Sequence, residues 1–147
     1  MDEYEKYEAE CEKRKEENHT FMIGFTRYLQ NKKLSKKTID THVRNIDFYI
    51  NEFLLYESPQ KASEGVNQLN YFLGYWFIRK AMWASPTSIK ENITSLKNFY
   101  SYMNKIGQVT NEELSEMKEE IKDSKSEWIE TVKKYDDPDV DMEEIWG

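Results

Sequence analysis

The chain has one cysteine, Cys11, among its 147 residues, so it cannot form an internal disulfide. A chain without disulfides suits a reducing compartment. Cys11 is surrounded by glutamates and lysines, and no histidine or second cysteine lies near it in the sequence. We therefore expect an exposed, inert thiol with no catalytic or metal-binding role.

Long apolar runs are also missing. No stretch of eighteen apolar residues occurs, so the sequence predicts no membrane-spanning helix and no membrane partner. The N-terminal segment MDEYEKYEAECEK is charged and has none of the apolar core of a signal peptide. We expect an unprocessed cytoplasmic protein.

The common motifs of cofactor and metal chemistry are absent as well. The sequence has no P-loop, no glycine-rich dinucleotide motif and no Cys/His zinc spacing. Glu112, Glu113 and Glu116 lie close together, but they lack the glycine-turned loop of a cation site and are typical of a solvated helix. We expect no enzymatic activity, no cofactor, no bound metal and no small-molecule substrate.

Charge is distributed unevenly along the chain, although the net value is -7. Residues 1–17 carry eight acidic and four basic side chains, residues 18–106 carry six and twelve, and residues 107–147 carry fourteen and five. The basic middle segment also holds 16 of the 21 aromatic residues. It therefore contains the predicted core, and it is the segment best suited to contact phosphate.

Apolar residues recur at helical spacing, and no convincing strand-like alternation is present, so the sequence predicts an all-α fold. Four helices form a compact bundle, and a fifth, whose apolar stripe is sparse, lies at its periphery. The predicted helices cover about 20–31, 34–54, 66–83, 85–106 and 112–134.

The same pattern divides the chain into four parts. They are a polar acidic extension (1–17), a core domain (18–109), a C-terminal amphipathic helix (110–134) and an acidic tail of disordered composition (135–147). The extension is compatible with a helix, and Tyr4, Tyr7 and Cys11 form a thin apolar stripe at helical spacing, so it is either a frayed helix or a segment docked on the core.

Local signals mark the helix ends. Ser35 is a good N-cap because its hydroxyl can accept from amides one turn into the helix. Ser85 followed by Pro86 is typical of a helix start, since proline lacks the N–H that would have no partner there. Further signals are a cap at Asn18 or Thr20, a stop at Gly107 and a capping box at Thr110–Glu113.

The third predicted helix is apolar nearly all round at its centre, YFLGYWFI, which indicates a central position in the bundle. We expect Trp76 and Phe77 to lie in the core rather than to form a stacking platform. Trp83 and Trp128 are expected to be buried or half-buried.

Two helices share one pattern. The stretch LSKKTIDTHVRNIDFYINEFL (34–54) is repeated in outline by SPTSIKENITSLKNFYSYMNK (85–105). The matching positions are Ser35 with Ser85, Thr38 with Ser88, Ile39 with Ile89, Val43 with Ile93, Ile46 with Leu96, and Tyr49 with Phe99.

This double pattern, preceded by F-x-x-Y-L at Phe25, resembles the SAM-like core-binding domain of tyrosine recombinases, the phage-integrase group. The resemblance covers about residues 19–109. It implies a four-helix SAM-like bundle that contacts duplex DNA through its second and fourth core helices, here 34–54 and 85–105. It also implies a part in DNA recombination or integration of a mobile element.

The catalytic domain of that family is absent. That domain needs an H-x-x-R element and a nucleophilic tyrosine. Here His42 begins H-x-R rather than H-x-x-R, and His19 begins neither sequence. None of the ten tyrosines lies in a matching motif. Cleavage and strand transfer are therefore not expected.

Basic and hydroxyl side chains fall outside the apolar stripes of both helices. Lysine, arginine and threonine suit phosphate contacts, arginine can also read guanine, and free amides at a helix N-terminus favour anions. The predicted DNA-binding residues are Lys33, Lys36, Lys37, Thr41, Arg44, Thr87, Lys90, Thr94 and Lys97.

Other interpretations stay open. Lysine-rich solvent faces are common, and Asp40 and Glu91 fall on or near the proposed face. The chain is alternatively a protein-interaction module that kept the fold and lost DNA binding, with the C-terminal helix or the acidic tail as its contact. The tail can also cover the basic middle and mimic phosphate. A fragment of a longer integrase is a further alternative.

Overall fold

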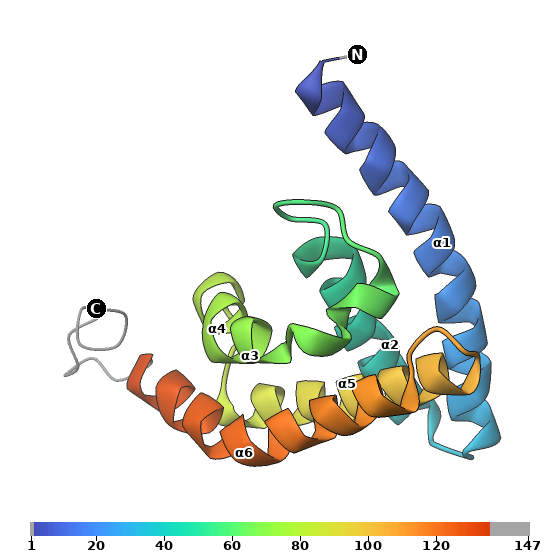
Figure 1. Cartoon of the computed structure of the whole chain (residues 1–147). Coiled ribbons are helices and arrows are strands. Elements are labelled where there is room, and N and C mark those ends of the chain that lie inside the picture. The colour runs from blue at the N-terminus through green and yellow to red at the C-terminus, as the bar shows by residue number, and fades with distance from the viewer. Residues whose placement is uncertain (1, 136–147) are drawn as a thin grey trace.

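The computed structural model describes residues 2–135, and none of them is in a strand, so the all-α prediction is confirmed. Figure 1 shows the arrangement of the helices. The longer elements are α1 (Glu3–Asn31), α2 (Lys36–Phe48), α5 (Pro86–Lys105) and α6 (Asn111–Tyr135). The shorter ones are the π-helical turn η1 (Tyr49–Phe53), the 3₁₀ segment η2 (Ala62–Asn67), α3 (Leu69–Tyr71), the π-helical turn η3 (Phe72–Trp76) and α4 (Phe77–Lys80). No helix in this part of the chain is both long enough and apolar enough to cross a bilayer.

The predicted start of the first helix at Thr20 is wrong, because α1 begins at Glu3. Asp2 caps it, accepting from the amide of Glu5 at 2.7 Å. Glutamate, lysine and alanine are good helix formers, and no glycine or proline interrupts them before Gly24, so the helix continues through the polar segment. Asn18 is not a cap; it is buried and donates to the side chain of Asn51 at 2.8 Å.

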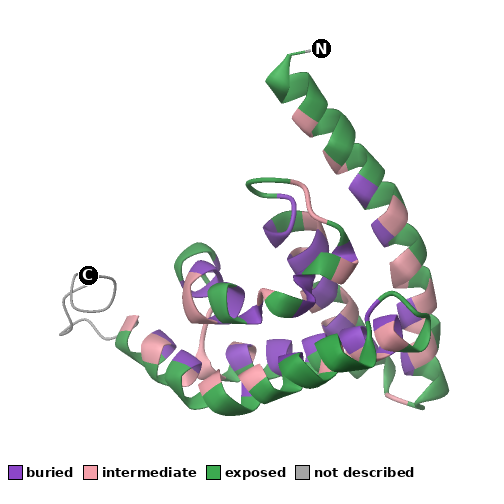
Figure 2. Ribbon diagram, viewed as in Figure 1, coloured by how far each residue is buried: buried purple, intermediate pink, exposed green. Residues whose placement is uncertain are grey.

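The first turns of α1 extend beyond the bundle and are mostly exposed, as Figure 2 shows. They are attached to the segment after η1, because the hydroxyl of Tyr7 donates to the carbonyl of Leu55. Arg14 is buried further along and pairs with Glu17 at 3.1 Å. The expectation of an exposed Cys11 is wrong, since its thiol is half-buried against the same Leu55 carbonyl.

The third predicted helix, 66–83, is shorter than expected at both ends. Residues 62–67 form a 3₁₀ segment, and regular helix resumes only at Leu69. At the other end Ala81 is extended, so the helix stops before Trp83. Trp76 and Phe77 are buried as predicted, whereas Trp83 is 57% exposed, contrary to expectation.

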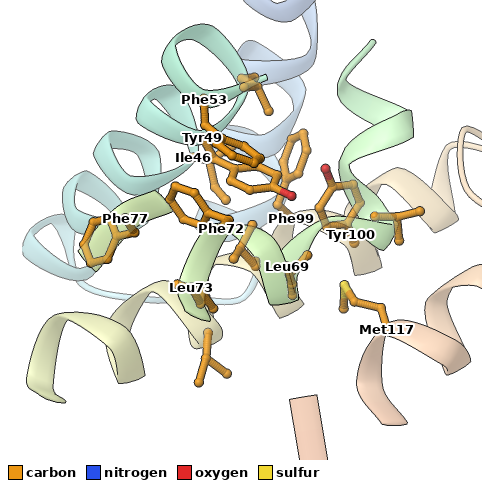
Figure 3. Packing of buried hydrophobic residues seen from close by; sticks show 14 of the residues in the cluster. Ile46, Tyr49, Phe53, Leu69, Phe72, Leu73, Phe77, Phe99, Tyr100 and Met117 are labelled. Carbon is orange, nitrogen blue, oxygen red and sulfur yellow. The ribbon is translucent and has the colours of Figure 1, made fainter. Parts of the chain in front are cut away.

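The core is aromatic and surrounds two buried tyrosines (Figure 3). The Tyr49 hydroxyl donates to the carbonyl of Gly65 at 2.6 Å, and the Tyr100 hydroxyl donates to the carbonyl of Ala62 at 2.8 Å. Burial raises the pKa of both tyrosines well above the usual value, so both remain donors at neutral pH. These bonds hold η2 against α5 and against η1, the turn that follows α2.

Candidate nucleic-acid interface

The two patterned helices begin as predicted. Ser35 accepts from the amide of Thr38 at 3.2 Å, and Ser85 accepts from the amide of Ser88 at 3.0 Å. Ser88 also accepts from the Ser85 amide at 2.8 Å, which completes a reciprocal cap. Equivalent local chemistry therefore starts both helices.

Equivalent positions in the two helices also face the core. All the matched apolar and aromatic side chains listed below are buried except Val43, which is half-buried. The repeated pattern thus buries the same stripe of each helix and leaves the opposite stripe to solvent. The pairs are Ile39 with Ile89, Val43 with Ile93, Ile46 with Leu96, and Tyr49 with Phe99.

α2 crosses α5 near the middle of both helices. Just before α2, Lys32 donates its Nζ to Oδ1 of Asn98 at 2.7 Å. Midway along α2, the side chain of Asn45 reaches Ser95, three residues earlier in α5. Just after α2, the ring of Tyr49 lies 6.5 Å from that of Tyr100, later in α5. The partners in α5 thus do not shift steadily in one direction, and the two helices cross rather than run alongside each other.

A polar cluster joins the two helices at their middle. Nδ1 of His42 lies 2.7 Å from Oγ of Ser95, and Nδ2 of Asn45 donates to the same oxygen at 3.0 Å. Ser95 donates its own proton to the carbonyl of Glu91 at 3.0 Å, so its oxygen is the acceptor for both α2 side chains. Ser95 is fully buried and is a structural hydroxyl rather than a nucleophile.

Burial lowers the pKa of His42, and the positive charge of Lys32 lowers it further, while Glu91 acts in the opposite direction. The unfolded chain takes up a proton here as the pH falls through 6.5, whereas folded His42 stays neutral to lower pH. The stability from neutral His42 is therefore fully present above pH 6.5 and is lost as the pH falls below it, toward the folded pKa.

We expect His42→Asn, which keeps a polar group but cannot take up a proton, to flatten this dependence. Urea unfolding of the wild type and the variant at mildly alkaline and mildly acidic pH measures the difference. All other ionisable groups are the same in both proteins, so their contributions to the pH dependence cancel in the difference between the two unfolding free energies. If both proteins lose the same stability on acidification, His42 is not a source of the pH dependence.

The predicted contact residues of the two helices are exposed, except for Thr41, which is half-buried. The hydroxyls of Thr41 and Thr94 donate within their own helices, to the carbonyls of Lys37 at 3.0 Å and Lys90 at 3.2 Å. Their protons are thus already used, and lysine and arginine are left as the donors to an anion. Among residues 2–135, no ion pair forms at Lys37, Arg44, Lys90 or Lys97.

The remaining predicted residues lie at the starts of the two helices. Lys36 pairs with Asp40 at 3.6 Å, in an exposed pair that neutralises part of its charge. Lys33 is exposed and has a φ of 61°, in the left-handed region that non-glycine residues seldom adopt. Thr87 is exposed in the first turn of α5.

Two hollows flank the exposed row of α2, and Arg44 lines both. One, of about 540 Å³, lies between α1 and α2 and includes His19 and Asp40. The other, of about 520 Å³, has aromatic walls from Phe48 and Trp83. No cluster of three or more histidine, cysteine or carboxylate side chains suited to a metal occurs in the described part of the chain.

The spacing of charged residues predicted the exposed rows, whereas the polar cluster and the Lys32–Asn98 bond were not predicted from the sequence. Small polar residues at helical spacing beside the apolar stripes, His42 and Asn45, were the available signal. These two residues indicate a polar contact only when α5 is known to pack on this side of α2.

Comparison of the chain with protein-family models, with curated proteins and with solved structures finds no match.

Proposed function

We propose that the protein binds duplex DNA without cutting it, through the exposed faces of α2 and α5, as an accessory to recombination or integration of a mobile element. The observation that carries this is the packing of two similarly capped helices that bury equivalent stripes and expose unpaired cations. The recombination context rests on the resemblance of residues 19–109 to recombinase core-binding domains.

Binding would be electrostatic in the main. Lys37, Lys90 and Lys97 contact phosphates, and Arg44 contacts either a phosphate or a guanine edge. Four phosphate contacts give a slope of about -3.6 in log K against log salt, because each contributes about 0.9. Affinity is therefore expected to be modest and to fall steeply as salt rises.

Fluorescence anisotropy of a labelled random duplex, titrated with the full chain at several salt concentrations, tests the proposal. We expect Lys37→Ala with Arg44→Ala to weaken binding and to make the slope shallower by about 1.8. The matched control is Lys6→Ala with Lys13→Ala, which removes two exposed cations from α1 and should leave binding unchanged. Circular dichroism checks that all three proteins keep their helicity.

Two results would reject this function: no binding by the wild type at low salt, or a Lys37/Arg44 variant that binds like the control. Nicking of supercoiled plasmid by the purified protein would reject the non-catalytic part separately.

A protein-interaction module is the second candidate, and exposed apolar side chains favour it. Met82 is 99% exposed and Trp83 is 57% exposed, next to the aromatic hollow. The acidic tail, proposed from the sequence as another contact or as a cover for the basic face, lies outside the described residues.

A further inference from the structure

The charges of α6 are segregated around the helix, although residues 107–147 are strongly acidic overall. Lys118, Lys122 and Lys125 are exposed, and their spacing of four and three residues places them on one face. Glu116 and Glu120 lie on another side, where they line a small hollow with residues of η2. Glu120 also accepts from the backbone amide of Asn70 at 3.2 Å.

The lysine face of α6 lies along α5. The two helices run antiparallel, side by side (Figure 1). Their register is fixed where Asn104 of α5 donates to Oδ1 of Asn111 in α6 at 2.8 Å. Asn111 is on the lysine side of α6, since Lys118 and Lys122 follow it by seven and eleven residues.

Counting away from this bond in both helices places lysines opposite each other. Seven residues back along α5 is Lys97, and seven residues forward along α6 is Lys118. Fourteen residues in each direction reach Lys90 and Lys125. The two levels are about 10.5 Å apart along the helices at 1.5 Å per residue. We call these four residues, with Lys122, the lysine ladder.

The lysine ladder has no anionic partner in the described residues. Elsewhere on the surface, lysines do pair, as Lys133 does with Glu130 at 3.9 Å and Lys36 with Asp40 at 3.6 Å. Like charges at spacings of three and four residues destabilise a helix, so the spacing of Lys118, Lys122 and Lys125 is unfavourable. An external polyanion would relieve it.

We propose that the DNA-binding surface continues from α5 onto α6 and that Lys118, Lys122 and Lys125 bind backbone phosphates of the duplex. This rests on the proposed function. α5 contacts both α2 and α6, and packed helices lie about 8–10 Å apart, so the lysines of α6 lie one helix spacing from those of α5.

The test compares the full chain with a variant carrying Lys118→Gln, Lys122→Gln and Lys125→Gln. Its control carries Lys6→Gln, Lys13→Gln and Lys134→Gln, the same change of charge at exposed positions away from the ladder. We expect the ladder variant to bind a labelled duplex more than about tenfold more weakly at low salt, with a slope shallower by about 2.7. Its thermal stability should equal or exceed that of the wild type, because repulsion is removed.

The outcomes separate the two proposals. If the wild type binds, the Lys37/Arg44 variant is weakened and the ladder variant behaves like its control, this inference is wrong and the proposed function stands. If the ladder variant is weakened without a change in slope, phosphate contact is likewise excluded. No binding by the wild type rejects both.

Discussion

Replacing Ile93 by aspartate is expected to unfold the protein. Ile93 is 3% exposed at the centre of α5, between the aromatic core and the packed helices. Burying an unpaired carboxylate costs several kcal/mol, which is comparable to the total stability of about 5–15 kcal/mol that domains usually have. Circular dichroism and size-exclusion chromatography at 25 °C measure the loss of helix and of compactness.

The neighbouring substitution Thr94→Asp is the matched control. Thr94 is exposed, so the same new charge remains in water and the fold should persist. Native helicity and similar melting temperatures in both variants would show that the assigned burial of α5 is wrong.

Trp128→Ala is expected to destabilise the protein by about 3–5 kcal/mol, the usual cost of removing a large buried aromatic side chain. Trp128 is 1% exposed, and its Nε1 donates to Oδ1 of Asn70 at 2.8 Å. Its ring packs so closely on Gly74 that a Cβ there would lie 3.0 Å from Cδ1 of the indole. The variant therefore loses both a packed ring and the hydrogen bond to Asn70. Urea unfolding of the full chain measures the difference.

Trp83→Ala provides the comparison, because it removes the same side chain from an exposed position. The Trp83 ring touches Phe48 and Phe77 by its edges only, so we expect a loss of about 1 kcal/mol or less. Equal unfolding midpoints for the two variants would contradict the placement of α6 on the core.

Local signals predicted the helix ends well where capping chemistry is self-contained. The caps at Ser35 and Ser85 form as expected, Gly107 takes a φ of 81° after α5, and Thr110 exchanges backbone-to-side-chain bonds with Glu113. Each of these depends on residues within four positions of one another. They can therefore be recognised without knowing the rest of the fold.

Features that depend on distant partners were not predictable in the same way. The helix of residues 3–17 follows from its helix-forming residues, but its attachment does not. The Tyr7 hydroxyl donates to the carbonyl of Leu55, 48 residues away, and the sequence pattern gives no means of naming that partner. The π-helical turns η1 and η3 add a residue to a turn that periodicity assumes to be regular. For the candidate interface, the exposed rows followed from spacing, whereas the His42–Ser95 contact required the pairing of α2 with α5.

The unbroken α1 gives the molecule an electrical polarity. At 1.5 Å per residue its 29 residues extend about 43 Å, and its first turns leave the bundle carrying a net negative charge (Figure 1). Under the proposed function, a duplex approaching this end would be repelled, while one approaching the outer faces of α2 and α5 would meet unpaired cations. In that case the charge distribution would favour encounters from the side of α2 and α5 over encounters from the start of α1.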